Sequence, residues 1–538
     1  MQAMPVDLQS SLSIASSGLN VIEYQYAVTS NNVANSSTPG YVSETPVVCS
    51  AVSCGYGTGV TQGMTQLNIS PALQKELYKQ NAIVAQNTAL SNSLSAISSV
   101  QGSTAAQSGQ TNTLSDVLGN LRAAVSSLID TPNQTSAQSA VISKAQAVVS
   151  VIHTLSETYA TQRQTAQNTI VSTVGTINTD LTRIGLLSKQ IMVMKALGED
   201  TASLQNERYG VMNALSSLVS VKFTEKSNGD VEVTTSNGTQ LPTYPGQINS
   251  TQPVITQAVD NWPLSTSKGS DLTESSYYGS SSGGTTDGTT GGTTGTIPPI
   301  KVAGANNTET DITNDLTGGT LGANITLRDE TYPKMQAQLD AFSYTLIQRF
   351  QKAGLPLFTD GTTDAGGNGG QTGLPTTASG KNLLGLAGNI NVSSAYAAKP
   401  ESLVQGTTGS GVDLTRLDNV LGQTFSSDSQ YVSGDYEAPT DNLGPTGNIS
   451  TGYSGTQSLI ALATSLTANQ SAVIANASNN LTYSTSVQTV IQTKVDGISG
   501  VNVDDEMARV VALQNAYAAN AKVISAVSTM FEYLMNAV

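Results

Sequence analysis

Two seams of regularly spaced side chains, one at each end of the chain, constrain its fold most strongly. At the N-terminal end they fall at alternating intervals of four and three residues: Leu8, Leu12, Ala15, Leu19, Ile22, Tyr26, Thr29 and Val33. The C-terminal end follows the same rhythm through Tyr517, Ile524, Val527, Phe531, Leu534 and Val538, with Asn520 as a polar member. Such a repeat places a seam along one side of a helix, which packs against another helix. Neither end has a partner beside it in sequence, so we expect residues near 20 to pack against residues near 525.

Helical periodicity recurs along most of the chain. Pro39 and Gly40 end the first helix, and Pro71 suits the first turn of the second. The longest periodic run contains no proline over about 60 residues, which corresponds to a rod on the order of 80–90 Å long. The predicted helices cover about 6–35, 71–97, 114–128, 141–184, 335–350, 456–497 and 503–538, the last with Asp504, Asp505 and Glu506 in its first turn.

The central region lacks this helical periodicity. Val219, Val221 and Phe223 alternate with polar residues, and Val231 and Val233 do so again after an Asn228-Gly229 pair. This pattern predicts a β-hairpin. Residues 265–299 are rich in Ser, Thr and Gly, and we expect them to be a disordered surface segment.

The predicted fold class is mainly α with β inserts. It comprises terminal helices in a coiled-coil-like pair, a long helical rod domain built from both halves of the chain, and a small β-containing outer domain. The predicted domains are a terminal assembly domain (1–60 and 498–538), a rod domain (61–218, 325–355 and 450–497), an outer domain (219–324) and a Gly/Thr-rich insert (356–449).

Charge and composition exclude several classes of protein. The net charge is −15 and no basic run is present, which argues against nucleic acid as a partner. No stretch approaches the roughly 18 consecutive apolar residues of a membrane span, so we expect no membrane insertion. The first basic residue is Lys75, so the N-terminal end lacks the positive region of a cleavable secretory signal.

Chemical motifs are scarce, and we expect no catalytic, cofactor-binding or metal site. The one histidine, His153, follows a core position of the long helix, where a structural role is the simpler interpretation. Cys49 and Cys54 are compatible with a local disulfide, with half a metal site, or with two incidental thiols. Asn20 and Asn520 either set the register of the terminal seam or face solvent.

The residues around the end of the first helix carry a resemblance. Residues 30–41 and 500–524 resemble the two end signatures of the axial proteins of the bacterial flagellum. The N-terminal signature includes Asn31, Asn32, Asn35, Thr38, Pro39, Gly40 and Tyr41. Markers in the middle (204–219, the Asn228-Gly229 hairpin, 318–331 and 355–360) resemble the hook-associated protein 1 family within that group.

The resemblance implies a structural protein without catalytic activity, which forms a junction ring between hook and filament. It implies partners: further copies of the chain in the ring, the hook protein, a second junction protein toward the filament, and an export chaperone bound to the C-terminal helix. Export through the flagellar type III apparatus would place the protein outside the cell. The packing residues would be Leu8, Leu12, Leu19, Ile22, Tyr26, Val33, Tyr517, Ile524, Val527, Phe531 and Leu534. Three alternatives stay open: a hook or distal-rod subunit, a surface adhesin that uses the Thr/Gly inserts, and a secreted enzyme on a flagellar scaffold.

Overall fold

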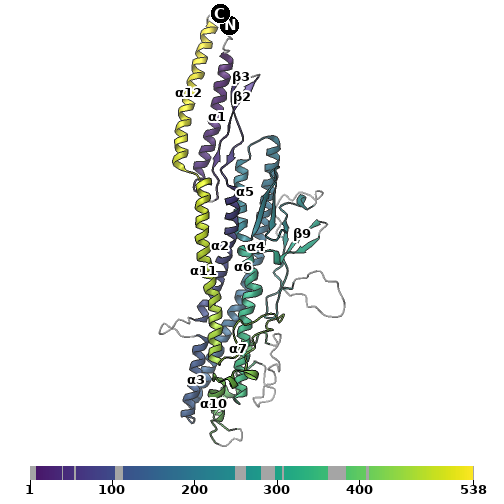
Figure 1. The fold of residues 1–538 in the computed structure, drawn as a ribbon, viewed down its shortest axis with the longest axis vertical. Coiled ribbons are helices and arrows are strands. Elements are labelled where there is room, and N and C mark those ends of the chain that lie inside the picture. Colours follow the sequence, from purple (N-terminus) through teal and green to yellow (C-terminus); the bar gives the residue numbers. More distant parts are fainter. Residues whose placement is uncertain are drawn as a thin grey trace.

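The chain forms a long, narrow rod with both termini at one end (Figure 1). A computed structural model describes residues 8–38, 40–53, 56–102, 113–248, 262–279, 297–305, 308–361, 383–406 and 411–536. The terminal helices α1 (Leu8–Ala34) and α12 (Val503–Asn536) lie side by side at that end (Figure 1). Their pairing confirms the expectation drawn from the two seams.

Long helices build the body of the rod below the terminal pair (Figure 1). Helix α11 packs along α2, and α4 contacts α2, α3, α5, α6 and α7. Their bounds are α2 (Pro71–Gln101), α3 (Leu114–Asp130), α4 (Thr135–Leu197), α5 (Ala202–Leu218), α6 (Gly319–Thr326), α7 (Tyr332–Lys352) and α11 (Leu459–Ser499). The sequence predicted these helices, apart from α5 and α6, and α4 extends well beyond both ends of its predicted range of 141–184.

Local chemistry explains where the helices begin and end. Pro71 opens α2, because its missing N–H costs nothing in the first turn. Thr113 and Asp116 form a capping box at the start of α3. Helix α4 has 63 residues and ends at Gly198, whose φ of 75° lets Glu199 N–H bond to Met194 O at 2.9 Å. At about 1.5 Å per residue it extends roughly 95 Å.

Small antiparallel sheets pack against the helices of the rod. Strands β5 (Val221–Glu225) and β6 (Val231–Thr235) pair around Asn228-Gly229 with Phe223 opposite Val233, which confirms the predicted hairpin. Strand β7 (Gln240–Leu241) extends this sheet, and a second sheet has the order β10 (Glu309–Asp311), β9 (Lys301–Ala303), β8 (Leu264–Ser265). Near the N-terminus, β1 (Glu44–Thr45) pairs with β4 (Gln66–Leu67), and β2 (Val48–Ser53) with β3 (Tyr56–Gln62).

The prediction of disorder over 265–299 is wrong for the residues that the structure describes within it. Residues 265–279 lie along α4, where the buried Arg163 guanidinium donates to Thr273 O at 2.9 Å and Ser276 O at 2.6 Å. The backbone carbonyls of this segment bind Arg163 on α4, so its Ser/Thr/Gly-rich composition did not reveal that it packs on the rod. Residues 280–296 lie outside the described part of the chain.

Residues 357–443 are less separate than their composition suggested. The described part contains β11 (Phe358–Thr359), α8 (Leu386–Asn389), β12 (Asn391–Val392), α9 (Ser394–Ala398) and α10 (Thr415–Asn419). Side chains such as Phe358, Ile390 and Leu417 are fully buried in one hydrophobic core with α3, α4, α7 and α11. A second core joins the C-terminal half of α4 to α5, β6 and the sheet of β8 and β9. The proposed boundary at residue 356 therefore crosses a shared core.

Candidate functional site at the terminal helix pair

The predicted seam lies between α1 and α12. Ala15, Ile22 and Thr29 are buried on α1, and Val527 is buried on α12. Leu12, Leu19, Val33, Ile524 and Phe531 are half-buried along the same faces. Leu8 and Leu534 fall within α1 and α12, but their side chains lie outside the described part of the structure, as does Val538.

Small and polar residues set how closely the two helices approach. A Cβ at Gly18 would lie 3.2 Å from Asn520 Oδ1, so Asn520 faces α1 across the seam. Asn520 Nδ2 donates to Ala516 O on its own helix at 3.2 Å. Asn20, in contrast, is exposed. Of the two interpretations weighed for these asparagines, solvent exposure holds for Asn20 and a seam position for Asn520.

Two predicted packing residues lie at the rim of the seam. Tyr26 and Tyr517 are 42% and 44% exposed. Together with Ile22, Ala27 and Leu513 they line an open groove of about 370 Å³ along the pair. Within the isolated chain these two rings therefore stay largely uncovered.

The β2–β3 hairpin covers another side of α1. Ser17 Oγ accepts from Val60 N–H at 3.2 Å, and a Cβ at Gly59 would lie 2.2 Å from that oxygen. Gly59 has φ of 123°, a conformation that disfavours other residues. Further along, Tyr24 Oη bonds with Thr65 Oγ1 at 2.8 Å, and Thr65 bonds in turn to Asp200, two residues before α5. This chain of contacts ties the terminal pair to the rod.

A buried polar network occupies the joint between the pair and the rod. Asn32 is fully buried, and its Nδ2 donates to Glu44 O at 2.8 Å and to Glu506 Oε1 at 3.1 Å. Its Oδ1 accepts from Glu44 N–H at 2.9 Å and from Tyr41 Oη at 3.0 Å. One amide therefore joins α1, the following loop and α12.

Asn206 makes an equivalent connection from α5. Its Oδ1 accepts from Val42 N–H and its Nδ2 donates to Val42 O, both at 2.8 Å. It also donates to Glu44 Oε1 at 3.2 Å, while Asn31 Nδ2 donates to Glu44 Oε2 at 3.3 Å. Burial raises the pKa of Tyr41 well above its usual range, and the nearby carboxylates of Glu44 and Glu506 raise it further.

Several residues of the N-terminal signature lie in this joint. Asn31, Asn32 and Tyr41 belong to the network, and Asn35 Nδ2 bonds back to Asn31 at 3.0 Å. Thr38 and Gly40 form the exposed turn, and Pro39 lies outside the described residues. Sequence reasoning missed Glu44 and Asn206 and assigned Glu506 only to the helix start. The four-and-three spacing of the C-terminal seam continues backward from Tyr517 through Leu513 and Val510 to Glu506. The spacing alone therefore places Glu506 on the seam of α12.

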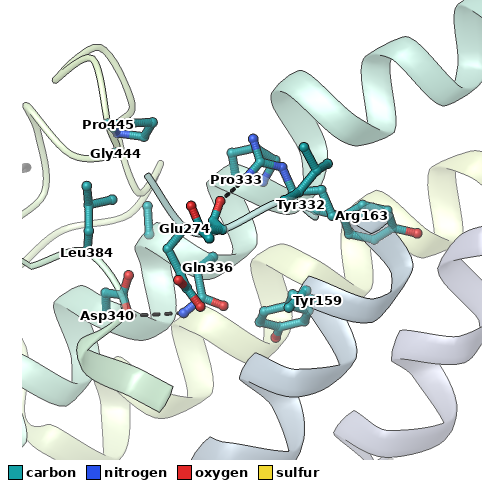
Figure 2. Close-up of a pocket in the computed structure, with 14 residues that line it drawn as sticks. Tyr159, Arg163, Glu274, Tyr332, Pro333, Gln336, Asp340, Leu384, Gly444 and Pro445 are labelled. Carbon is teal, nitrogen blue, oxygen red and sulfur yellow. Dashed lines mark hydrogen bonds between the residues drawn. The ribbon is translucent and has the colours of Figure 1, made fainter. Parts of the chain in front are cut away.

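A second pocket, farther down the rod, is lined by Tyr159, Arg163, Glu274 and Asp340, among others (Figure 2). Its volume of about 30 Å³ is close to that of a single water molecule. Burial raises the pKa of Asp340 to about 7, although Gln336 Nε2 and the N–H groups of Gly385 and Ala387 donate to it. This carboxyl group therefore binds the start of α8.

The other residues considered as catalytic or metal-binding candidates are His153, Cys49 and Cys54. His153 Nε2 lies 2.7 Å from Ile390 O, which joins α4 to the end of α8. Cys49 is exposed on β2, and Cys54 lies outside the described residues. Within the described ranges, no three His, Cys, Asp or Glu residues are arranged to hold a metal ion. None of the helices described is long and apolar enough to cross a membrane.

Comparison with known families gives three matches along the chain. The flagellar hook-associated protein FlgK helical domain matches residues 103–365. The flagella basal body rod protein family matches residues 12–41, and the flagellar basal body rod FlgEFG protein C-terminal family matches residues 497–537. The central match separates hook-associated protein 1 from other axial proteins. Together with the curated relatives, these matches support a place for the chain in the flagellar hook-associated protein 1 family.

Curated relatives agree with this family. Flagellar hook-associated protein 1 of Bacillus subtilis is 26% identical over 42% of this chain and 46% of its own length. The Salmonella typhimurium protein of the same name is 24% identical over 44% of this chain and 42% of its own length. The aligned region thus spans less than half of each relative. A solved flagellar hook junction protein FlgK from Burkholderia pseudomallei is 20% identical, with a TM-score of 0.38 over 54% of this chain and 44% of that one.

Proposed function

We propose that this chain is a structural subunit of the bacterial flagellum that forms a junction ring between hook and filament. The observation that carries the proposal is the terminal pair of α1 and α12, which stands beyond the end of the rod and leaves apolar side chains uncovered. The family matches of the chain supply the biological context. In this role the chain acts by packing, without catalysis.

The uncovered residues lie mainly on α12. They include Val503, Met507, Val511, Tyr517, Val523, Met530, Tyr533 and Met535, each at least 40% exposed. An apolar surface of this extent is typical of a region that a partner covers. The terminal helices are mobile in the free subunit and become ordered against neighbouring copies, where apolar burial offsets a backbone ordering cost of about 1–2 kcal/mol per residue.

The same role implies several partners. Copies of the chain contact one another around the ring, the hook protein contacts one side, and a second junction protein contacts the filament side. Before assembly, an export chaperone covers the C-terminal helix, and the subunit leaves the cell through the flagellar export channel. The terminal, rod and outer domains are the mechanical units of this assembly.

A deletion strain tests the proposal. Cells without the chain should build hooks that lack filaments and should shed flagellin into the medium, and a plasmid copy should restore filaments. Immunogold labelling of the tagged chain should mark a narrow band at the end of the hook. Normal filaments in the deletion strain would overturn the proposal.

A hook or distal-rod subunit is the second candidate. The matches of both chain ends to basal body rod families favour it, because such ends are common to several axial proteins. A subunit of this kind is present in many more copies. Labelling along the whole hook or rod would therefore select this candidate.

A further inference from the structure

Glu506 is a charged residue on the buried seam of α12. The four-and-three spacing runs from Glu506 through Val510 and Leu513 to Val527, and on the described part of the helix Glu506 and Val527 are the buried residues. A seam position normally carries an apolar side chain, because such a side chain gains free energy from burial. An acidic residue at this position therefore calls for a physical explanation.

Hydrogen bonds satisfy one of the two carboxylate oxygens of Glu506. Its Oε1 accepts from Asn32 Nδ2 at 3.1 Å. Its Oε2 has almost no accessible surface and no hydrogen-bond partner among the described residues. Neither a protein group nor solvent therefore replaces the hydration that this oxygen loses on burial. A carboxylate in this state raises the free energy of the packed helix pair.

The charges around Glu506 do not offset this cost. Arg509 Nη1 is 3.9 Å from Glu506 Oε1, but the Arg509 side chain is 54% exposed, so solvent screens the attraction. Glu44 is a second buried carboxylate in the same joint, where Asn32 Nδ2 donates to both residues. Glu44 and Glu506 both raise the pKa of Tyr41. Like charges repel strongly away from water, so Glu44 adds to the cost.

The helix N-terminus does not account for this acidic residue. Negative side chains in a first turn interact favourably with the helix dipole. Asp504 and Asp505 are exposed in the first turn of α12 and supply this charge without being desolvated. Glu506 therefore adds little by this route, and its burial remains unfavourable.

A short break joins α12 to the rod, so α12 can move by itself. Helix α11 ends at Ser499 and α12 begins at Val503. Asn502 caps the new helix, because its Oδ1 accepts from Asp504 N–H at 3.1 Å. A cavity of about 890 Å³ lies between the turn after α1, the end of α11 and the start of α12, and its acidic wall includes Asp496. Helix α12 can therefore leave α1 while α11 stays packed on α2.

We propose that Glu506 keeps α12 loosely packed on α1 in the free subunit and so delays self-association until neighbouring copies cover the pair. The inference rests on the proposed assembly role and names the residue that regulates it. In the free chain, the cost of the unpaired oxygen favours release of α12. In the assembly, burial of the exposed apolar side chains of α12 outweighs that cost. Elements that become ordered on binding are normally of low stability in the free protein.

Hydrogen exchange of the free subunit tests this inference. Glu506→Gln keeps an Oε1 acceptor for Asn32 and removes the buried charge. We expect residues 507–530 to exchange at least tenfold more slowly in this variant, with residues 141–191 unchanged. The exposed Glu532→Gln on the same helix is the matched control and should exchange as the unchanged chain does. Unchanged or faster exchange of residues 507–530 in Glu506→Gln would overturn the inference.

Sedimentation velocity tests the delaying role. At equal concentration, purified Glu506→Gln should place at least twice as large a share in oligomers as the unchanged chain or Glu532→Gln, because its terminal pair is already packed. Equal shares in all three proteins would overturn the delaying role. Both measurements use the free subunit, so they are independent of the deletion strain. Normal filaments in that strain would refute the assembly role and leave the measured effect of Glu506 on packing in place.

Discussion

At the scale of single residues, the amide of Asn32 links three parts of the chain. It donates to Glu44 O and to Glu506 Oε1 while accepting from Glu44 N–H and Tyr41 Oη. An amide suits this position because it offers donors and acceptors together, which neither a carboxylate nor an apolar side chain does. The N-terminal signature includes Asn32, but the hydrogen-bond partners of Asn32 cannot be predicted from that signature.

Asn32→Asp should weaken the joint. The carboxylate keeps the acceptor role, loses both donated hydrogen bonds and adds a negative charge beside Glu506. We expect local stability to fall by roughly 2–4 kcal/mol at pH 7. Hydrogen exchange of the Glu44 and Glu506 amides measures it. The exposed Asn20→Asp serves as control, and equal exchange in both variants would contradict the prediction.

Asp340 should make stability depend on pH. Burial raises its pKa from 3.8 to about 7 in the folded state, so between these values the folded chain binds a proton that the unfolded chain has lost. Stability therefore falls as pH rises through this window, by about 1.4 kcal/mol per pH unit. Melting temperatures at pH 5 and pH 7 test this. The change in melting temperature between pH 5 and pH 7 should be smaller in Asp340→Asn and unchanged in the exposed control Asp441→Asn. The same change in both variants would contradict the role of Asp340.

At the scale of elements, helix positions and the contact face of the terminal pair follow from local patterns, but the exposure of individual side chains on that face does not. Proline, glycine and capping residues set the ends of α2, α3 and α4. The seam rhythm located the contact face of α1 and α12. It could not show that Tyr26 and Tyr517 lie at the rim, because exposure depends on how far apart the helices stand.

Leu19→Asp and Phe531→Asp should each prevent assembly. Both side chains are half-buried along the pair, and a carboxylate there would be desolvated without a partner. We expect no detectable incorporation into flagella, with helicity of the rod retained by circular dichroism. The exposed Ser150→Asp on α4 is the matched control. Normal incorporation of either seam variant would refute the proposed role of the pair.

At the scale of the whole molecule, burial is concentrated in the rod. The buried side chains of α4 extend from Gln138 to Ile191, whereas on the described part of α12 they are Glu506 and Val527. A helix with few buried contacts opens at low free-energy cost. The free chain should therefore be unevenly stable, with its terminal pair weaker than its rod.

Hydrogen exchange of the free subunit should reveal this gradient. Residues 141–191 should exchange more slowly than residues 507–530 by at least a hundredfold, because α4 lies in both hydrophobic cores. In assembled flagella, residues 507–530 should be protected from exchange almost as strongly as residues 141–191. Equal protection in the free chain would mean that the pair is already as stable as the rod.

The sequence by itself determined most of the long helices, the β5–β6 hairpin and the pairing faces of the two ends. These depend on spacing, capping and turn residues that lie within a few positions of one another. The tertiary structure decided the joint, its acidic cavity and the packing of residues 265–279 and 383–443. Asn32 and Glu506 are 474 positions apart, and Arg163 captures carbonyls more than a hundred positions away. Contacts of this kind leave no local pattern, because only folding brings the partners together.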